Sequence, residues 1–134
     1  MLTYAALLLL FNTQTKAFDL PPNLLASMCY VESQHNIHAH HVKDGATDSF
    51  GVCQIKLATA KQMGFTGSAD QLMKPEVNTY YAAKFLKYQI TRYNSVPRGV
   101  TAYNKGHSSS DGNSAYYQKI TKVLAVGFKL AKNN

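Results

Sequence analysis

Residues 20–31 form the longest uncharged stretch of the middle of the chain, and their pattern predicts a buried helix. Asn23 stands where it could cap this helix, directly after a Pro-Pro pair. Apolar residues then point in nearly every direction around the axis, up to Glu32, the first carboxylate after the stretch. Because Leu25, Cys29 and Glu32 share one face at helical spacing, the acid continues an apolar stripe. Desolvation there would raise its pKa, as a proton donor near neutral pH requires, whereas a solvated Glu at a helix end is the alternative.

Helical spacing also dominates the remainder of the chain, which predicts a mainly α protein. Gly64 closes one expected helix, and Ser68 opens a short one with Gln71 as its capping-box partner. The other expected elements, in chain order, are a loop or short hairpin over residues 49–55, helices over 57–63 and 75–93, a piece ending near Asn104, and a last helix with an apolar stripe of Tyr117, Ile120, Leu124, Phe128 and Ala131. No repeat or linker divides the chain, so we expect one domain.

The first 17 residues have a different composition from the rest. Residues 2–11 are an apolar run that is too short to span a bilayer but typical of the core of a secretory signal. Small residues before Phe18 offer a cleavage site, which divides the chain into a signal peptide at 1–17 and a domain at 18–134. No Lys or Arg precedes the run, unlike most signals, so an N-terminal core helix or a retained anchor is the alternative.

Composition and charge limit the partners. The 134 residues are 46% hydrophobic, which fits one globular domain with a real core. Fourteen basic residues against seven acidic ones give a formal charge of +7, which favours anionic partners such as nucleic acid, acidic lipid or bacterial wall polymer. Because no two basic residues are adjacent and no nucleic-acid motif is present, a nucleic-acid stripe is not supported.

Two clusters of reactive side chains have more than one interpretation. Cys29 and Cys53 could form the single disulfide of an exported protein or remain two buried thiols. A polar stretch after Glu32 holds the candidates for a metal site: His35, His38, His40, His41, Asp44 and Asp48. Their spacing matches no metal motif and the stretch has the composition of a surface loop, so we expect no metal and no cofactor.

Four segments, in order and spacing, resemble one protein family. They are Val31-Glu32-Ser33, Ser49-Phe50-Gly51-Val52-Cys53-Gln54-Ile55, Asn78 with Ala82 to Leu86, and Ala102-Tyr103-Asn104-Lys105-Gly106. Together they resemble the soluble lytic transglycosylase (SLT) domain, from the goose-type-lysozyme-like branch of the lysozyme superfamily. The resemblance covers about residues 20 to 125. It implies a lysozyme-like single domain in which a catalytic helix and a long polar loop or small hairpin are surrounded by a helical bundle.

The resemblance also implies roles for five residues. Glu32 matches the single acid and base of the family, and Ser33 follows it as a residue that orients it or contacts substrate. Gln54, Tyr103 and Asn104 match residues that line the glycan groove. Two departures affect only the detail of the groove: Cys53 replaces the usual Met, and Lys56-Leu57 replaces the usual Pro.

The implied reaction is cleavage of the β-1,4 bond between N-acetylmuramic acid and N-acetylglucosamine in peptidoglycan strands. A lytic transglycosylase needs one carboxyl group and leaves 1,6-anhydromuramoyl ends, whereas a lysozyme-type hydrolase usually needs a second carboxylate. Asp44 and Asp48 are the candidates for that second acid, and Glu76 opens a different helix, where the helix dipole favours an acid. A non-catalytic peptidoglycan-binding module of an envelope-spanning machine is a third hypothesis.

These hypotheses share one setting. We expect an exported monomer in the periplasm or at the cell wall, bound to peptidoglycan rather than nucleic acid, without a membrane span once the signal is cleaved. Wall remodelling, a secretion or conjugation apparatus, and a phage are all compatible with the sequence.

Overall fold

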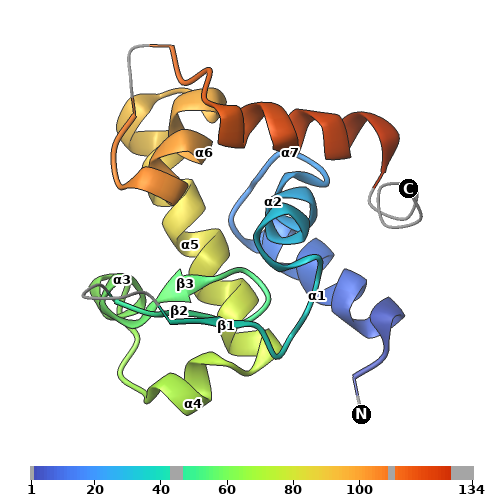
Figure 1. The fold of residues 1–134 in the computed structure, drawn as a ribbon, viewed down its shortest axis with the longest axis vertical. Coiled ribbons are helices and arrows are strands. Elements are labelled where there is room, and N and C mark those ends of the chain that lie inside the picture. Colours follow the sequence, from blue (N-terminus) through green and yellow to red (C-terminus); the bar gives the residue numbers. More distant parts are fainter. Residues whose placement is uncertain (1, 43–46, 109–110, 128–134) are drawn as a thin grey trace.

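The computed structural model describes residues 2–42, 47–108 and 111–127, and this part of the chain forms helices around a small antiparallel sheet (Figure 1). The elements are α1 (Tyr4–Ala17), α2 (Leu24–Ser33), β1 (His40–His41), β2 (Ser49–Phe50), β3 (Ile55–Lys56), α3 (Leu57–Gln62), α4 (Ala69–Leu72), α5 (Pro75–Tyr93), α6 (Val96–Lys105) and α7 (Ala115–Val126). The expected mainly α, lysozyme-like single domain is confirmed.

Helix α2 is the centre of the fold. Every residue from Leu24 to Tyr30 is buried, as the uncharged stretch predicts, and α1 and α7 pack directly on the helix. The expected cap is wrong in one respect: Asn23 occupies the N-cap position, but its side chain caps nothing. A side-chain cap requires extended backbone, whereas Asn23 has a φ of 65°, in the left-handed region that Asn tolerates.

Helix α1 lies where the sequence predicts a signal core. It packs against α2 and α5, and its Leu7 and Phe11 are each 2% exposed in the main hydrophobic core. Cleavage before Phe18 stays a prediction, and it would remove this helix from the fold. None of the helices among the described residues has the length and apolar character to cross a membrane.

The sheet is a three-stranded meander, and one buried side chain fixes the turn between its second and third strands. β1, β2 and β3 pair in that order, with His40 opposite Phe50. Asn78 of α5 is completely buried; its side-chain oxygen accepts from the Cys53 N–H at 2.8 Å and its amide nitrogen donates to the Phe50 carbonyl at 2.8 Å. Gly51 has a φ of 78° and faces this amide, so a Cβ there would collide with Asn78. The loop after β2 is therefore anchored on α5.

The other helices largely follow their predicted bounds. The expected capping box of Ser68 and Gln71 is present at the start of α4, and α5 spans the predicted 75–93. A small hydrophobic cluster joins α3 and α4 to the sheet, separate from the main core around α2. Both clusters include side chains of α5: Ala82, Ala83 and Leu86 belong to the main core, and Val77 and Tyr81 pack against the smaller cluster.

Helix α7 differs from the stripe predicted for it. Ile120 and Val123 are its buried residues, whereas Leu124 is 38% exposed. Phe128 and Ala131 lie outside the described residues. The prediction continued from Ile120 to Leu124, four residues further on. The face of α7 that packs against α2 instead continues from Ile120 to Val123.

Candidate active site

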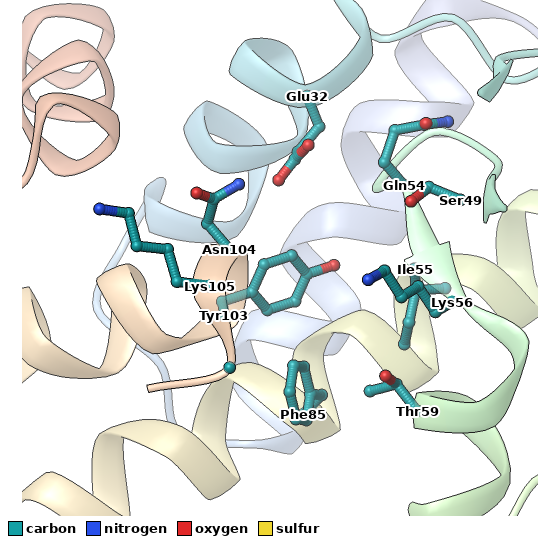
Figure 2. Close-up of a pocket in the computed structure, with 11 residues that line it drawn as sticks. Glu32, Ser49, Gln54, Ile55, Lys56, Thr59, Phe85, Tyr103, Asn104 and Lys105 are labelled. Carbon is teal, nitrogen blue, oxygen red and sulfur yellow. The ribbon is translucent and has the colours of Figure 1, made fainter. Parts of the chain in front are cut away.

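A cleft opens beside the C-terminal end of α2, and Glu32 projects into it (Figure 2). The residues that line it are Glu32, Ser49, Gln54, Ile55, Lys56, Thr59, Phe85, Tyr103, Asn104, Lys105 and Gly106. They come from α2, the sheet, α3, α5 and the end of α6. Glu32 is the only Asp or Glu in this lining. Its carboxyl lies between Gln54 on one side and Asn104 on the other, facing Tyr103 (Figure 2).

The Glu32 carboxyl is held from α7. The Tyr116 hydroxyl donates to Glu32 Oε2 at 2.6 Å, a short distance typical of a bond to a charged acceptor. Burial raises the pKa of Tyr116 well above its usual value, and the negative charge of Glu32 adds to the effect. The hydroxyl therefore stays protonated and keeps donating. The sequence interpretation missed Tyr116, although its spacing of four from the buried Ile120 was a usable signal.

Tyr103 presents its ring rather than its hydroxyl to the cleft. The hydroxyl donates to the Cys53 carbonyl at 2.8 Å, and the side chain is buried. Burial, followed by the charge of Glu32, raises the pKa of Tyr103 well above its usual value. Because the ring also packs against Phe85, with 5.4 Å between centroids, the two aromatics form a rigid apolar floor (Figure 2).

Gln54 and Asn104 both line the cleft but differ in what their amides contact. The Gln54 nitrogen donates to the Gly51 carbonyl at 2.8 Å and the Ala39 carbonyl at 3.1 Å, and its oxygen pairs with His41 Nδ1 at 2.5 Å. Its polar atoms thus hold the hairpin together, and its side chain forms a fixed wall. Asn104 is exposed, and its amide points toward Glu32 (Figure 2).

Ser33 is not among the residues that line the cleft. Its hydroxyl donates to the Val52 carbonyl at 2.7 Å, which ties the end of α2 to the loop after β2. A disulfide between Cys29 and Cys53, with Cα atoms 4.4 Å apart, joins the same two segments. The helix that carries Glu32 is therefore linked to the loop that carries Gln54 by both a covalent bond and a hydrogen bond.

The histidines after α2 point to different places. His35 is buried, where Tyr4 bonds its Nδ1 at 2.8 Å, whereas His40 pairs with Asp48 at 2.8 Å on the exposed hairpin. Asp44 lies outside the described residues. Among those that are described, no three His, Cys, Asp or Glu side chains are placed to hold a metal ion.

These features define a class of protein: a mainly helical, lysozyme-like domain with one carboxylate at the end of a buried helix, facing an aromatic cleft. The family model described as the transglycosylase SLT domain matches residues 9–124. The chain therefore belongs to the SLT domain family, and the resemblance seen in the sequence is confirmed. The match begins inside α1, so part of that helix belongs to the shared domain.

Two curated proteins share this region. A protein named "Transglycosylase" from Enterobacteria phage PRD1 is 29% identical over 114 residues, which cover 83% of this chain and 40% of the relative. Protein IpgF from Shigella sonnei is 28% identical over 93 residues, which cover 68% of this chain and 61% of the relative. The chain thus spans less than two thirds of either relative, and the similarity concerns the domain rather than the whole of those proteins.

Proposed function

We propose that this chain is a peptidoglycan lytic transglycosylase that cleaves the β-1,4 bond between N-acetylmuramic acid and N-acetylglucosamine without water. The observation that carries the proposal is that Glu32 bears the only carboxyl group among the described residues that line the cleft. Membership of the SLT family supports a glycan-cleaving enzyme that acts on peptidoglycan. The proposal adds the residue that acts and the products that form.

Of the two candidates for a second acid, Asp48 does not line the cleft and Asp44 lies outside the described residues; Glu76, the only other glutamate of the chain, does not line the cleft either. The Asp48 carboxylate is bonded to His40 Nε2 at 2.8 Å, and Glu76 is exposed in the first turn of α5. Retaining and inverting hydrolases place their two carboxyl groups about 5 to 9.5 Å apart across the bond that they cleave. An arrangement with one carboxyl in the cleft favours a mechanism in which the same group gives and then takes a proton.

In the proposed reaction, neutral Glu32 donates its proton to the oxygen that leaves with N-acetylglucosamine, and the bond from that oxygen to C1 of N-acetylmuramic acid breaks. The Glu32 carboxylate then accepts the proton of the C6 hydroxyl of the same muramic residue. The deprotonated C6 oxygen then bonds to C1 of the same residue and closes a 1,6-anhydro ring. Each proton is accounted for, and the carboxyl returns to its starting state.

The other residues of the site have supporting roles in this proposal. The Tyr103 and Phe85 rings provide an apolar face against which a sugar can stack. Asn104 offers amide groups to the N-acetyl or hydroxyl groups beside the bond that breaks. Gln54 keeps the opposite wall in place, and Ser33 contributes by holding the end of α2 rather than by touching substrate.

The substrate also places the enzyme outside the cytoplasmic membrane, at the periplasm or the wall. Export through the apolar N-terminal segment, with cleavage before Phe18, remains part of the proposal. So do the settings of wall remodelling, a secretion or conjugation apparatus, and a phage. Because the chain spans only part of its relatives, the proposal includes none of the partners of those proteins.

The test is digestion of purified peptidoglycan with the chain, followed by mass spectrometry of the released fragments. The 1,6-anhydromuramoyl ends expected from the proposal are 18 Da lighter than the reducing ends of a hydrolase, the mass of one water. Reducing ends would identify a lysozyme-type muramidase. Binding without release would identify a glycan-binding module.

A pair of variants assigns the reaction to the cleft. Glu32→Gln keeps the shape of the side chain but cannot donate a proton, so release should fall to background while the circular dichroism spectrum stays unchanged. Glu76→Gln makes the same change at the exposed start of α5 and should retain full release. Full activity of Glu32→Gln would disprove the central assignment.

A further inference from the structure

The outward face of α5 carries a shallow groove that is distinct from the cleft. We call it the α5 groove; Lys84, Lys87, Tyr88, Thr91 and Arg92 of the helix line it, with Met63 and Phe18 at its edges. Lys84, Tyr88 and Arg92 follow one another at intervals of four and so share one helical face. Tyr88 is 45% exposed, so its ring is accessible from the groove.

The α5 groove is continuous with the cleft. A hollow between them is lined at one end by Thr59, Phe85 and Gly106, which also line the cleft. At its other end it is lined by Tyr88 and Arg92, which also line the α5 groove. The cleft, this hollow and the α5 groove therefore adjoin one another, so a substituent of a glycan in the cleft can be directed past Phe85 toward the α5 groove.

Within the described part of the chain, none of the three cations of the α5 groove, Lys84, Lys87 and Arg92, forms an ion pair with an Asp or Glu side chain. Lys84 donates to the Met63 carbonyl at 2.7 Å and Arg92 to the Gly106 carbonyl at 3.2 Å, both neutral acceptors. Three positive charges around an exposed aromatic side chain suit a ligand that has carboxylates on a partly apolar backbone.

We propose that the α5 groove binds the stem peptide of the peptidoglycan strand whose glycan occupies the cleft. The inference rests on the proposed function. Within the strand the sugars carry hydroxyl and N-acetyl groups, and the lactyl carboxyl is bonded to the peptide as an amide. The free carboxylates therefore lie on the stem peptide, which leaves the glycan sideways at each muramic residue. Lys87 and Arg92 contact those carboxylates, and Tyr88 packs against the aliphatic part of the peptide.

The test compares two forms of the same soluble strands. In both forms the amines are acetylated; in one form the peptide carboxylates are also converted to methylamides. Binding is measured by fluorescence anisotropy with the full chain carrying Glu32→Gln, so that the strands remain uncleaved. We expect binding about three- to tenfold tighter when the carboxylates are free, because a few exposed charge pairs contribute that much.

Two variants and matched controls locate the effect. Lys87→Glu reverses one charge of the α5 groove, and Thr91→Glu adds an acid at an exposed position without removing any side-chain bond recorded there. Each should abolish the preference for free carboxylates. Lys119→Glu and Lys119→Gln make the same changes in net charge on the exposed side of α7 and should retain the preference.

The proposal is overturned if the two forms bind equally, if either groove variant keeps the preference, or if the Lys119 controls lose it as well. A different outcome would assign the groove to a membrane. In that case the wild-type chain binds vesicles of anionic phospholipid, both groove variants lose this binding, and the two forms of the strands bind equally well. The products of the wild-type chain are scored separately. Reducing ends or no release refute the transglycosylase, whereas anhydro ends without a carboxylate preference refute only the peptide site.

Discussion

Replacing Tyr116 by Phe tests whether Glu32 depends on its hydrogen bond from α7. The substitution removes one oxygen atom and leaves the ring in the space it now fills. The lost bond is 2.6 Å long, and its acceptor is a carboxylate beside the cleft. Because the bond fixes how the carboxyl is turned toward the substrate, the loss should lower kcat more than it raises KM.

The size of the effect follows from the kind of bond. A hydrogen bond to a charged group contributes about 1.5 to 3 kcal/mol. If that energy supports the orientation needed in the transition state, kcat should fall roughly 10- to 150-fold, at about 1.4 kcal/mol for each factor of ten. Removal of a residue needed only for the fold would instead lower the thermal midpoint and leave kcat of the folded fraction unchanged.

The neighbouring tyrosine provides the control. Tyr117 is also partly buried against the core, and Tyr117→Phe removes the same atom one position along α7. Release of anhydro fragments should be followed by chromatography over a range of substrate concentrations, alongside thermal unfolding of both variants. The reasoning is refuted if Tyr116→Phe keeps kcat within twofold of wild type, or if Tyr117→Phe loses as much.

Three further perturbations follow from the structure. Because burial raises the pKa of Tyr103 and Tyr116 in the folded state, the unfolded chain loses these protons first above about pH 10, and each tyrosine should lower the unfolding free energy by up to about 1.4 kcal/mol per pH unit there. Urea titrations between about pH 10 and 11 should therefore show a shallower loss of stability in Tyr116→Phe than in the wild type, by up to that amount per pH unit. Replacing Cys29 and Cys53 together by Ala opens a loop with a sequence separation of 24, which should cost roughly 3 to 4 kcal/mol in urea unfolding; no change would mean that the bond does not form. Deleting residues 1–17 removes two core side chains worth about 1.5 to 3 kcal/mol each and should lower the thermal midpoint; a deletion variant as stable and active as the full chain would instead support cleavage before Phe18.

The sequence predicted the helix of Glu32 and the long helix over 75–93 because both express local rules. An unbroken apolar stretch is buried whatever surrounds it, and a helix that begins at Pro75 and repeats apolar residues at helical spacing needs no information from distant parts of the chain. The four motifs then placed Glu32, Tyr103 and Asn104 beside one cleft, as the structure also shows.

The partners of those residues were harder to predict because they are distant in sequence. Tyr116 lies 84 residues from Glu32, and nothing local to either position indicates the contact. The same limit applies to the first helix: the apolar composition of residues 2–11 suits a secretory signal and a buried helix equally well. In the full chain Leu7 and Phe11 pack in the main core, as a buried helix would; cleavage of the segment before Phe18 stays a prediction.

One of the two departures from the family pattern, Cys53, has a structural role in the folded chain. Cys53 stands at a position where the family usually has Met, and it forms the disulfide with Cys29, one helical turn before Glu32. Its neighbour Gln54 forms one wall of the cleft, so the covalent bond ties this wall to the helix that carries Glu32.

Glu32 is thus held by three contacts whose atoms lie behind the cleft surface: the disulfide, the bond from Ser33 to the Val52 carbonyl, and the Tyr116 hydroxyl. An enzyme with one carboxyl in its cleft must place that group correctly for two successive proton transfers, to a leaving oxygen and from an attacking one. In a site with two carboxyl groups, the acid and the base can each be positioned for one transfer. In the proposed mechanism one carboxyl group must suit both transfers. The contacts behind Glu32, which come from the loop after β2 and from α7, therefore suit the single-acid mechanism that we propose.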